Sequence, residues 1–385
     1  MFSQPMIYLD NAATSFPKPA ECLRRALDLY LTCGASPGRG GYDRAVEAEA
    51  MVQAVRDKIA GLFGAARGAR VCFAANATDA LNTLILGLLE TGDHVVTTRL
   101  EHNSVLRPLN HLQQSLGIGV EHVPFNKSGF VEPDRIDACL RPETRVVIVN
   151  HASNVLGTVQ PVAAIGAICK ARGIPLVVDA SQSAGCIPIL MEQWGITGLA
   201  FTGHKSLLGP TGTGGLVLAP DLDLAPSRFG GSGVDSMNPF QPDEYPFRLE
   251  AGTSNLLGIL GLGESIDFVA AHMERFREEE RRLTARLVEG LRAVPSGRIH
   301  LFAADAIGRH LPVVTCRVDG IASSDVGAIL DGDFEIAVRT GLHCAPLVHA
   351  DLGTAPSGAV RFSLGPFTTE ADIDAAIRAM AAIAG

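Results

Sequence analysis

Long apolar runs, basic clusters and a secretory leader pattern are all missing from this chain of 385 residues. No stretch approaches the roughly 18 uninterrupted apolar residues of a membrane-spanning helix, and residues 1–10 lack a basic region followed by an apolar core. No run rich in Lys and Arg occurs, and the formal net charge is −9. We therefore expect a cytoplasmic protein that binds neither a membrane nor nucleic acid.

Paired cysteine motifs and metal-ligand spacings are missing as well. None of the eight cysteines belongs to a C-x-x-C motif. In a reducing compartment we expect free thiols, and all but one of them should pack as small hydrophobic residues. His94, His102 and His111 have no acidic or thiol partners at zinc spacing, so no metal site is predicted.

Apolar residues make up 47% of the chain, and they fall into strand-like runs that alternate with helical segments. Its length allows two domains of ordinary size and a large core. Strand-like runs occur at 70–75, 94–98, 120–124, 145–150, 176–179, 198–201 and 215–218, and the clearest helical segments between them are 78–89 and 161–171. Alternating strands and helices predict an α/β fold with a mainly parallel sheet covered on both faces.

The two flanks of this pattern differ from it. Residues 256–294 have helical periodicity, and the charged run 274–282 places opposite charges three and four apart, which is typical of a solvated helix face. The strands 312–318, 337–339 and 359–363 then alternate with helices at 323–330 and 369–382. These predict a smaller α+β domain.

The entry segment, residues 7–45, combines a short strand, a helix at 20–32 and a glycine-rich loop at 34–41. This loop lacks the preceding strand and the Lys-Ser/Thr ending of a P-loop. We interpret it as a tight loop near a subunit interface or the rim of the site.

Lys205 is the residue around which the chemistry can be organised. It follows the apolar run 198–201 and precedes the glycine-rich stretch 207–215. Such a lysine suits an amine that forms a Schiff base with pyridoxal phosphate, because burial lowers its pKa and frees it as nucleophile and base. Asp179, 26 residues earlier at the end of a strand, can face the pyridine nitrogen of that cofactor. The alternatives are a surface lysine and a loop-capping aspartate.

Five candidate side chains share one position relative to the predicted strands. Each lies at or just after the end of a strand: Thr78, His102, Asn154, Asp179 and Lys205. Because the carboxyl ends of parallel strands meet at one edge of a sheet, we expect these side chains to converge. Thr78 also opens a helix, which suits a phosphate but equally suits a simple N-cap.

Seven motifs occur in order at 8–14, 101–103, 153–158, 178–182, 202–205, 250–253 and 339–345. Together they resemble the successive motifs of class V aminotransferase-fold enzymes, and most of all the cysteine desulfurases with a short cysteine-bearing loop, which are similar also to selenocysteine lyases. The resemblance implies the PLP-dependent transferase fold type I. It implies a large domain, 16–258, with a mainly parallel seven-stranded sheet, and a small α+β domain, 1–15 and 259–385, that carries the cysteine loop.

The resemblance also implies a site for pyridoxal 5'-phosphate. Lys205 would hold the cofactor and move the proton at the substrate α-carbon, and Asp179 would face the pyridine nitrogen. His102 would stack on the ring, although a lone histidine is usually a hydrogen-bonded core residue. Gln182 would donate to the phenolic oxygen, and Asn154 would bond near it or hold the substrate carboxylate. The implied phosphate cradle is Ala77, Thr78, Thr202, His204 and, from the neighbouring subunit of a homodimer, Thr253.

Cys344 distinguishes the implied reaction from other uses of the cofactor. Beside Arg339 and His343, its thiolate would attack the sulfur of the substrate, which leaves a persulfide on Cys344 and releases alanine. The alternative is a small buried hydrophobic residue. Arg361 would clamp the substrate carboxylate through its planar fork, or would serve as a structural ion-pair partner. The other implied substrate-binding residues are Asn11, Ala13, Asn154 and Arg339.

The sequence thus predicts a homodimeric cysteine desulfurase that converts L-cysteine to L-alanine. Its persulfide sulfur would pass to an acceptor protein for iron-sulfur cluster assembly or a similar use. The alternatives are a selenocysteine lyase acting on L-selenocysteine, a class V aminotransferase, and a non-catalytic sulfur carrier or scaffold. Leu342, Pro346 and residues 206–208 depart from the best-known short-loop pattern, but none removes a reacting group.

Overall fold

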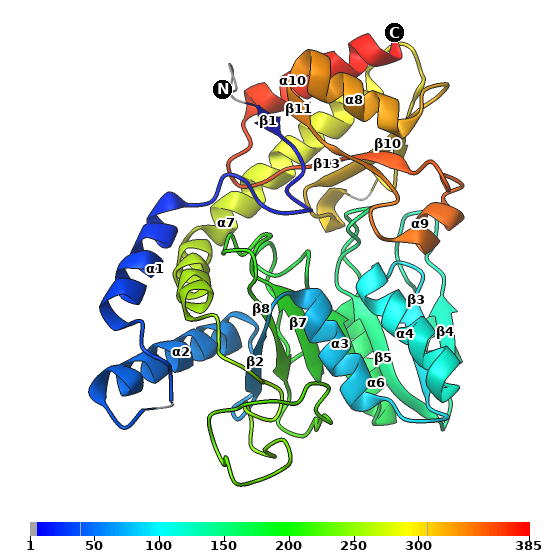
Figure 1. Ribbon diagram of the computed structural model, residues 1–385. Coiled ribbons are helices and arrows are strands. Elements are labelled where there is room, and N and C mark those ends of the chain that lie inside the picture. Colours follow the sequence, from blue (N-terminus) through cyan, green and yellow to red (C-terminus); the bar gives the residue numbers. More distant parts are fainter. Residues whose placement is uncertain (1–5, 39, 306) are drawn as a thin grey trace.

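A seven-stranded sheet forms the larger body of the molecule, and a smaller unit lies above it in Figure 1. The computed structural model describes residues 6–38, 40–305 and 307–385. Residues 1–5 of the predicted small domain and Arg39 of the predicted glycine-rich loop lie outside the described residues. Helix α7 (Leu256–Arg292) runs from the flank of the larger body into the smaller unit.

The strand order of the large sheet is β2-β8-β7-β6-β5-β3-β4. Its strands are β2 (Arg70–Ala74), β3 (His94–Thr98), β4 (Gly119–Val123), β5 (Thr144–Asn150), β6 (Leu176–Asp179), β7 (Gly198–Thr202) and β8 (Gly214–Leu218). β8 runs antiparallel to both of its neighbours, because a short connection returns the chain directly from β7. The strands β7, β6, β5, β3 and β4 pair in parallel. The predicted mainly parallel α/β sheet is confirmed.

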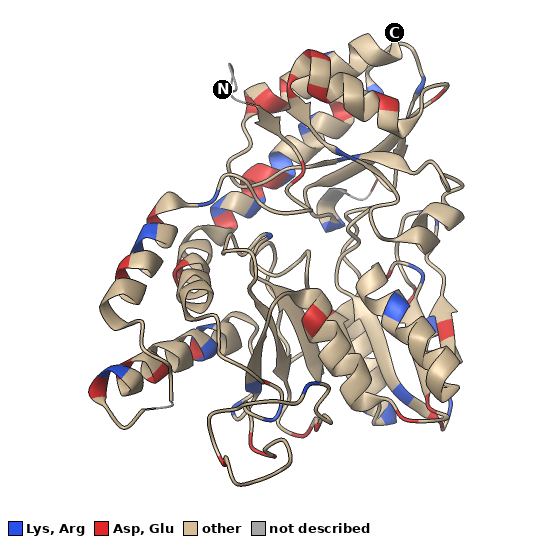
Figure 2. Ribbon diagram, in the orientation of Figure 1, with Lys and Arg blue, Asp and Glu red and all other residues tan. Residues whose placement is uncertain are grey.

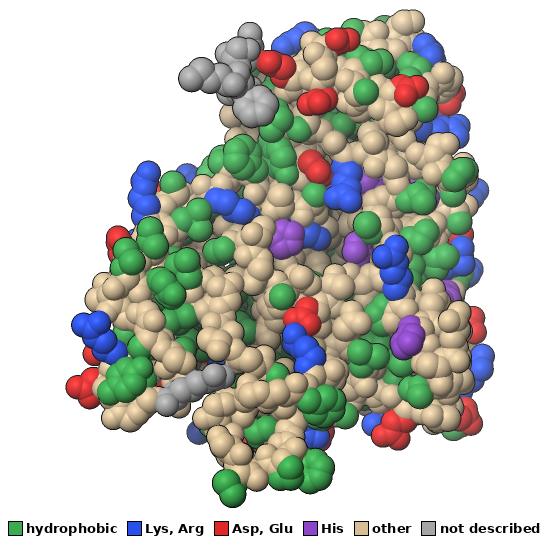
Figure 3. Space-filling model, viewed as in Figure 1, with side chains coloured by type: hydrophobic (Ala, Val, Ile, Leu, Met, Phe, Trp, Pro, Cys, Tyr) green, Lys and Arg blue, Asp and Glu red, His purple; other side chains and the backbone are tan. Residues whose placement is uncertain are grey.

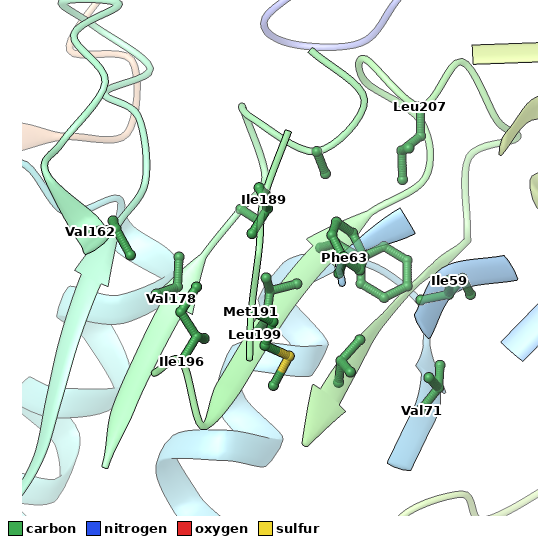
Figure 4. Packing of buried hydrophobic residues seen from close by; sticks show 14 of the residues in the cluster. Ile59, Phe63, Val71, Val162, Val178, Ile189, Met191, Ile196, Leu199 and Leu207 are labelled. Atoms are coloured by element: carbon green, nitrogen blue, oxygen red, sulfur yellow. The ribbon is translucent and has the colours of Figure 1, made fainter. Parts of the chain in front are cut away.

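Helices cover both faces of this sheet, and successive strand residues point to opposite faces. Val146 and Ile148 pack with α3 (Ala77–Leu88) and α4 (Asn103–Leu116) on one face. Val147 and Val149 pack on the other face, in a cluster that also contains residues of the helices α1 (Ala20–Cys33), α2 (Asp43–Leu62), α5 (Pro133–Cys139) and α6 (Val162–Arg172). Figure 4 shows part of this second cluster, where side chains from α2 and from the sheet point toward one another.

The smaller unit contains a four-stranded antiparallel sheet in the order β12-β13-β10-β9. Its elements are β9 (Ile299–Phe302), β10 (Val313–Val318), β12 (Arg339–Gly341), β13 (Ala359–Ser363), α8 (Ser323–Phe334), α9 (Pro346–Asp351) and α10 (Glu370–Ala384). β1 (Ile7–Tyr8) pairs in parallel with β11 (Ile336–Ala337), which brings the amino-terminal strand to this unit. Leu9 accordingly packs in one cluster with Leu283, Phe362 and Met380.

Helix α7 is, among the described residues, the one helix that is long and apolar enough to cross a membrane. More than half of its most apolar stretch is buried within the molecule, as in the core helix of a soluble protein, and the helix packs on α1 and α2. The charged run 274–282 is not uniformly solvated as predicted. Phe276 and Glu280 are buried in it, because one side of the helix faces the rest of the molecule.

Candidate active site

The carboxyl ends of the parallel strands open into a cavity of about 320 Å³. Most of the predicted site residues line it: Ala13, Ala77, Thr78, His102, Asn154, Asp179, Gln182, Thr202, His204, Lys205, Arg339, Cys344 and Arg361. Asn11 lines a small adjoining cavity together with Gln182. Thr253 lines a separate cavity, so this chain by itself does not bring it to the others. Residues that follow five strands of the large sheet, together with residues of the smaller unit, therefore line one cavity.

Lys205 lies in the connection between β7 and β8. Burial lowers its pKa to about 8, and the nearby Asp179 carboxylate opposes this shift. The residue before it is fixed by the amino-terminal segment. Thr14 Oγ1 and Lys18 Nζ donate to the backbone oxygen of His204 at 3.1 and 2.5 Å, respectively. An amine of lowered pKa on a tethered loop is suited to nucleophilic and base chemistry.

Asp179 is 5% exposed and ends β6. Its Oδ1 accepts hydrogen bonds from the backbone N–H of Ser181 at 2.8 Å and from the Ser181 hydroxyl. Within the described residues its Oδ2 has no hydrogen-bond partner. Because Asp179 lines the cavity, this second oxygen is available to a cationic N–H group of a ligand.

His102 forms the N-cap of α4. Its Nδ1 accepts the backbone N–H of Ser104 at 3.1 Å and lies 2.7 Å from the Ser104 hydroxyl, which is 2.8 Å from Thr78 Oγ1. Burial lowers the pKa of His102 to about 4, so the ring is neutral at pH 7. Since Nδ1 accepts, the ring proton lies on Nε2. This network fixes the plane of an uncharged ring in the cavity wall.

Arg339 and Arg361 are register partners on the antiparallel strands β12 and β13. The Arg361 side chain is 2% exposed, and its Nη1 donates to the Asn154 backbone oxygen at 3.0 Å and its Nη2 to Asp10 Oδ1 at 2.7 Å. Its buried Nε has no hydrogen-bond partner within the described residues. Two like charges directly opposite each other repel and destabilise the sheet. An anion bound near both guanidinium groups would attract each of them and offset this repulsion.

Cys344 lies on the loop between β12 and α9. His343 and Cys344 have φ angles of 49° and 57°, a region that non-glycine residues rarely occupy. The larger body holds both residues there. Asn154 Nδ2 donates to the His343 oxygen and the Asn103 backbone N–H to the Cys344 oxygen, each at 2.7 Å. The loop therefore places the thiol in the wall of the same cavity as Lys205.

Two hydrogen bonds support this loop from behind. His343 Nδ1 lies 3.1 Å from His349 Nε2, and His349 Nδ1 lies 2.8 Å from Thr354 Oγ1. Burial lowers the pKa of His343 to about 3 and that of His349 to about 4. Both rings are neutral at pH 7, so each has one donor and one acceptor nitrogen for this chain of bonds.

Comparison with known proteins places these residues in a family. The sequence profile of the family described as aminotransferase class-V matches residues 7–376. The chain belongs to the aminotransferase class-V family.

Within this family, the similar proteins carry one name. The chain is 33% identical to a probable cysteine desulfurase of Methanothermobacter thermautotrophicus, an alignment that covers 98% of this chain and 95% of the relative. It is 32% identical to a cysteine desulfurase of Pectobacterium atrosepticum, with 96% and 91% covered. These relatives confirm the predicted resemblance to cysteine desulfurases.

Solved structures of the class-V fold agree with this. The apo structure of a cysteine desulfurase from Thermococcus onnurineus NA1 superposes with a TM-score of 0.90 at 32% identity and covers 98% of this chain and 94% of that one. The cysteine desulfurase CsdA from Escherichia coli, in an S-sulfonic acid form, gives 0.85 at 27% identity, with 97% and 93% covered.

Class-V aminotransferase enzymes use pyridoxal phosphate, and the residues of this cavity fit that group. Lys205 offers the amine and Asp179 Oδ2 the acceptor for a pyridine N–H. Helix α3 begins at Ala77, where the first N–H groups have no intrahelical acceptor and suit a phosphate. His204 Nδ1 is a buried ring nitrogen without a hydrogen-bond partner in the described part of the chain.

Several cavity residues of this class-V chain were not predicted. They include Asn76, Ser104, Asn150 and Ser181. Asn150 ends β5, so the strand-end argument applied to Asn154 could have identified it. Ser104 and Ser181 donate hydrogen bonds to His102 and Asp179, respectively. In the sequence they could be recognised only by their position two residues after these side chains.

Proposed function

We propose that the chain is a pyridoxal-phosphate-dependent cysteine desulfurase that converts L-cysteine to L-alanine and leaves the sulfur as a persulfide on Cys344. The observation that carries this proposal is that Lys205 and Cys344, from opposite units of the molecule, line one cavity. Relatives named cysteine desulfurase, at about 30% identity over nearly the whole chain, support it.

Pyridoxal phosphate, when bound, supplies an electron sink for bond cleavage next to the substrate amino group. Lys205 would hold the cofactor through its amine, and its lowered pKa increases the share of the amine that is free to do so. The same amine then removes the proton at the substrate α-carbon. Asp179 would face the pyridine nitrogen and favour its protonated form, and the neutral His102 ring would stack on the cofactor.

Arg361 and Arg339 orient the substrate in this proposal. Both guanidinium groups line the cavity, and the unpartnered Nε of Arg361 is a donor left over after its bonds to Asp10 and Asn154. A substrate carboxylate between the two arginines would relieve their mutual repulsion. This places the β-carbon and sulfur of the substrate toward the loop that carries Cys344.

Cys344 carries out the sulfur transfer. Its thiolate attacks the sulfur atom of the substrate, a sulfur–sulfur bond forms, and the carbon–sulfur bond breaks with its electron pair left on the β-carbon. A proton completes the methyl group of alanine. Cysteine plus a thiol thus gives alanine plus a persulfide, and no external oxidant or reductant is needed. The persulfide sulfur then passes to an acceptor protein, for iron-sulfur cluster assembly or a similar use.

Replacement of Cys344 by Ala tests this function. The variant should retain cofactor absorbance, because Cys344 does not hold the cofactor, while alanine release from L-cysteine falls by roughly two orders of magnitude or more. Cys139→Ala is the matched control, since Cys139 lies outside the cavity. Mass spectrometry of wild-type protein after addition of L-cysteine should find one extra sulfur on Cys344.

Unchanged alanine release by the Cys344→Ala variant would remove the thiol from the mechanism. Parallel assays with L-selenocysteine, and with pyruvate as amino acceptor, then separate a selenocysteine lyase and an aminotransferase from a desulfurase. Purified protein without cofactor absorbance would instead indicate a scaffold without this chemistry.

We also propose that the protein is a homodimer. Hydrophobic side chains gather over α1 and α2 in Figure 3. The exposed apolar residues of these two helices and of the amino-terminal cap of α2 include Leu27, Leu31, Tyr42 and Val46. An apolar surface of this kind marks a protein contact. Thr253 lies outside the cavity of its own chain, so a role for it at the cofactor phosphate requires the other subunit of such a dimer.

We propose that the chain forms a large domain of residues 16–258 and a small domain of residues 1–15 and 259–385. A hydrophobic cluster in which Leu9 packs with residues from 283 onward supports this division. We place the protein in the cytoplasm, because its eight cysteines are all free thiols, as is usual in a reducing compartment.

A further inference from the structure

A second cavity, of about 480 Å³, lies beside α7 and is larger than the active-site cavity. It is enclosed by the start of α6, residues 186–188, one side of α7 and residues 308–312. Apolar side chains such as Val162, Ile187 and Trp194 supply most of its wall. Small-molecule sites in proteins are typically concave, mostly apolar and provided with a few polar groups.

Three arginines at this cavity have no carboxylate partner. Arg277, Arg281 and Arg309 are exposed, line the cavity and form no ion pair within the described residues. Other arginines of α7 behave differently, since Arg282 pairs with Glu279 and Glu370, and Arg286 pairs with Glu370 and Asp374. Within the described residues Arg277 and Arg281 thus have no ion-pair partner at the cavity, and neither has Arg275, which lies outside it. Figure 2 shows the mixed charges along this part of α7.

Inside the cavity, His151 presents a polar ring without a partner. It is 2% exposed, and its buried Nδ1 has no hydrogen bond to any described residue. The ring packs edge-on against Trp194, with centroids 5.5 Å apart. Burial lowers the pKa of His151 to about 4, so the ring is neutral at pH 7. A buried polar group without a hydrogen-bond partner is costly.

The floor of the cavity carries two acidic groups in their neutral forms. Cys186 Sγ donates to Glu280 Oε2 at 3.7 Å, and both side chains are buried. Burial raises the pKa of Glu280 to about 8 and that of Cys186 well above its usual value. At neutral pH the floor therefore does not repel an anion. The guanidinium groups of Arg277, Arg281 and Arg309 set the sign of the charge at the cavity.

We propose that this cavity is a second ligand site, for a small organic anion with an aromatic or branched apolar body. The acidic group of the ligand would lie at the arginines of α7, and its body would fill the apolar space beside Trp194 and His151. This site does not depend on the desulfurase function. A small cavity lined by Gln182, Cys186 and Glu280 lies between it and the active-site cavity, so the two sites are neighbours.

Trp194 makes the proposal directly measurable, because it is the one tryptophan of the chain. Anilinonaphthalene sulfonate, an aromatic anion whose fluorescence rises in apolar sites, serves as the probe with the cofactor-loaded enzyme. Excitation of Trp194 should give saturable energy transfer to the probe. The double variant Arg277→Gln, Arg281→Gln should bind it on the order of tenfold more weakly, because charge-assisted contacts are lost. Arg275→Gln on the same helix, outside the cavity, should bind it like wild type.

Two further measurements keep the test decisive. Phenylnaphthylamine, the neutral counterpart of the probe, should bind at least several-fold more weakly than the sulfonate. Ala163→Phe, an exposed position of α6 at the cavity, should fill the space and abolish energy transfer while cofactor absorbance and melting temperature stay as in wild type. The proposal is overturned if wild-type protein shows no energy transfer from Trp194 to the probe, or if the double arginine variant binds the probe as tightly as wild type. It is also overturned if the neutral probe binds as tightly as the sulfonate, or if Ala163→Phe retains the energy transfer.

Discussion

Burial shifts the pKa values of several side chains at the active-site cavity toward their neutral forms. The pKa of Lys205 is lowered to about 8 and that of His102 to about 4, while the pKa of Glu101 behind the cavity is raised to about 8. Glu101 accepts hydrogen bonds from Thr98 Oγ1 at 2.6 Å and from the Asn150 backbone N–H at 3.0 Å. Withdrawal from water is the largest cause of each shift. The groups that face a ligand are then the Asp179 carboxylate, the two arginines and the protonated fraction of Lys205.

The lowered pKa of Lys205 predicts how apo-protein takes up its cofactor. Only the free amine attacks an aldehyde, so the rate of pyridoxal phosphate uptake should rise with pH and level off above about pH 8. At pH 7 about a tenth of the amine is free, against well under a thousandth for an ordinary lysine. Stopped-flow absorbance of the cofactor measures this rate. A plateau reached only near the ordinary lysine pKa contradicts the prediction, and Lys205→Ala is the control that should show no uptake by this route.

At the scale of elements, the β12–α9 loop decides where the thiol lies. The backbone oxygens of His343 and Cys344, its two residues with positive φ, accept hydrogen bonds from Asn154 and Asn103 of the larger body. The His343 ring is bonded in addition to His349, which is bonded to Thr354. His349 and Thr354, which form the second set of bonds, do not line the cavity. The loop geometry can therefore be perturbed without changing any group that touches a ligand.

His349→Ala should separate sulfur transfer from cofactor binding. Loss of the bonds to His343 and Thr354 leaves Nδ1 of His343 without a partner and loosens the loop, so kcat for alanine formation should fall by about tenfold. KM for L-cysteine and the cofactor content should stay unchanged, because His349 does not line the cavity. His300→Ala, an exposed histidine paired with Asp319, is the matched control. A rise in KM with constant kcat would argue against a positioning role.

Local sequence patterns predicted the large sheet well and the peripheral elements less well. Residues 198–201 were expected as a strand, and β7 extends over Gly198–Thr202 because every position in it is buried. Helix α4 was not singled out, since Pro108 lies inside it and its amino-terminal cap is the histidine His102. β9 was not identified either, because its residues are only half-buried and give no strong alternation.

The convergence of site residues could also be predicted, since it follows from strand direction. The five residues expected at one sheet edge line one cavity, whereas the contribution of Arg339 and Cys344 came from the family resemblance alone. No local pattern places β12 over the ends of β5 and β7, because that depends on how the smaller unit packs on the larger one. The role of Thr253 also came from the resemblance, and it stays a prediction because Thr253 lines a separate cavity of this chain.

At the scale of the whole molecule, several large apolar side chains of α1 and α2 are exposed. Leu27 is 46% exposed and Leu31 is 72% exposed on one helix, and Tyr42 and Val46 continue the surface at 54% and 63%. Burying one leucine side chain is worth about 1.5–3 kcal/mol, and a twofold contact buries each position twice. Such a surface favours association with a second copy of the chain.

The variant Leu27→Glu, Leu31→Glu should therefore be a monomer at concentrations where the wild type is a dimer. Two leucines lost from each subunit remove several kcal/mol of association, so the dimer dissociation constant should rise by about a thousandfold or more. Light scattering after size-exclusion chromatography measures this. Phe334→Glu, an exposed apolar position of α8 far along the chain, is the control that should remain a dimer. If Thr253 reaches the phosphate of the other subunit, the monomer should also hold pyridoxal phosphate less tightly, and a dimeric double variant would contradict the assignment of this surface.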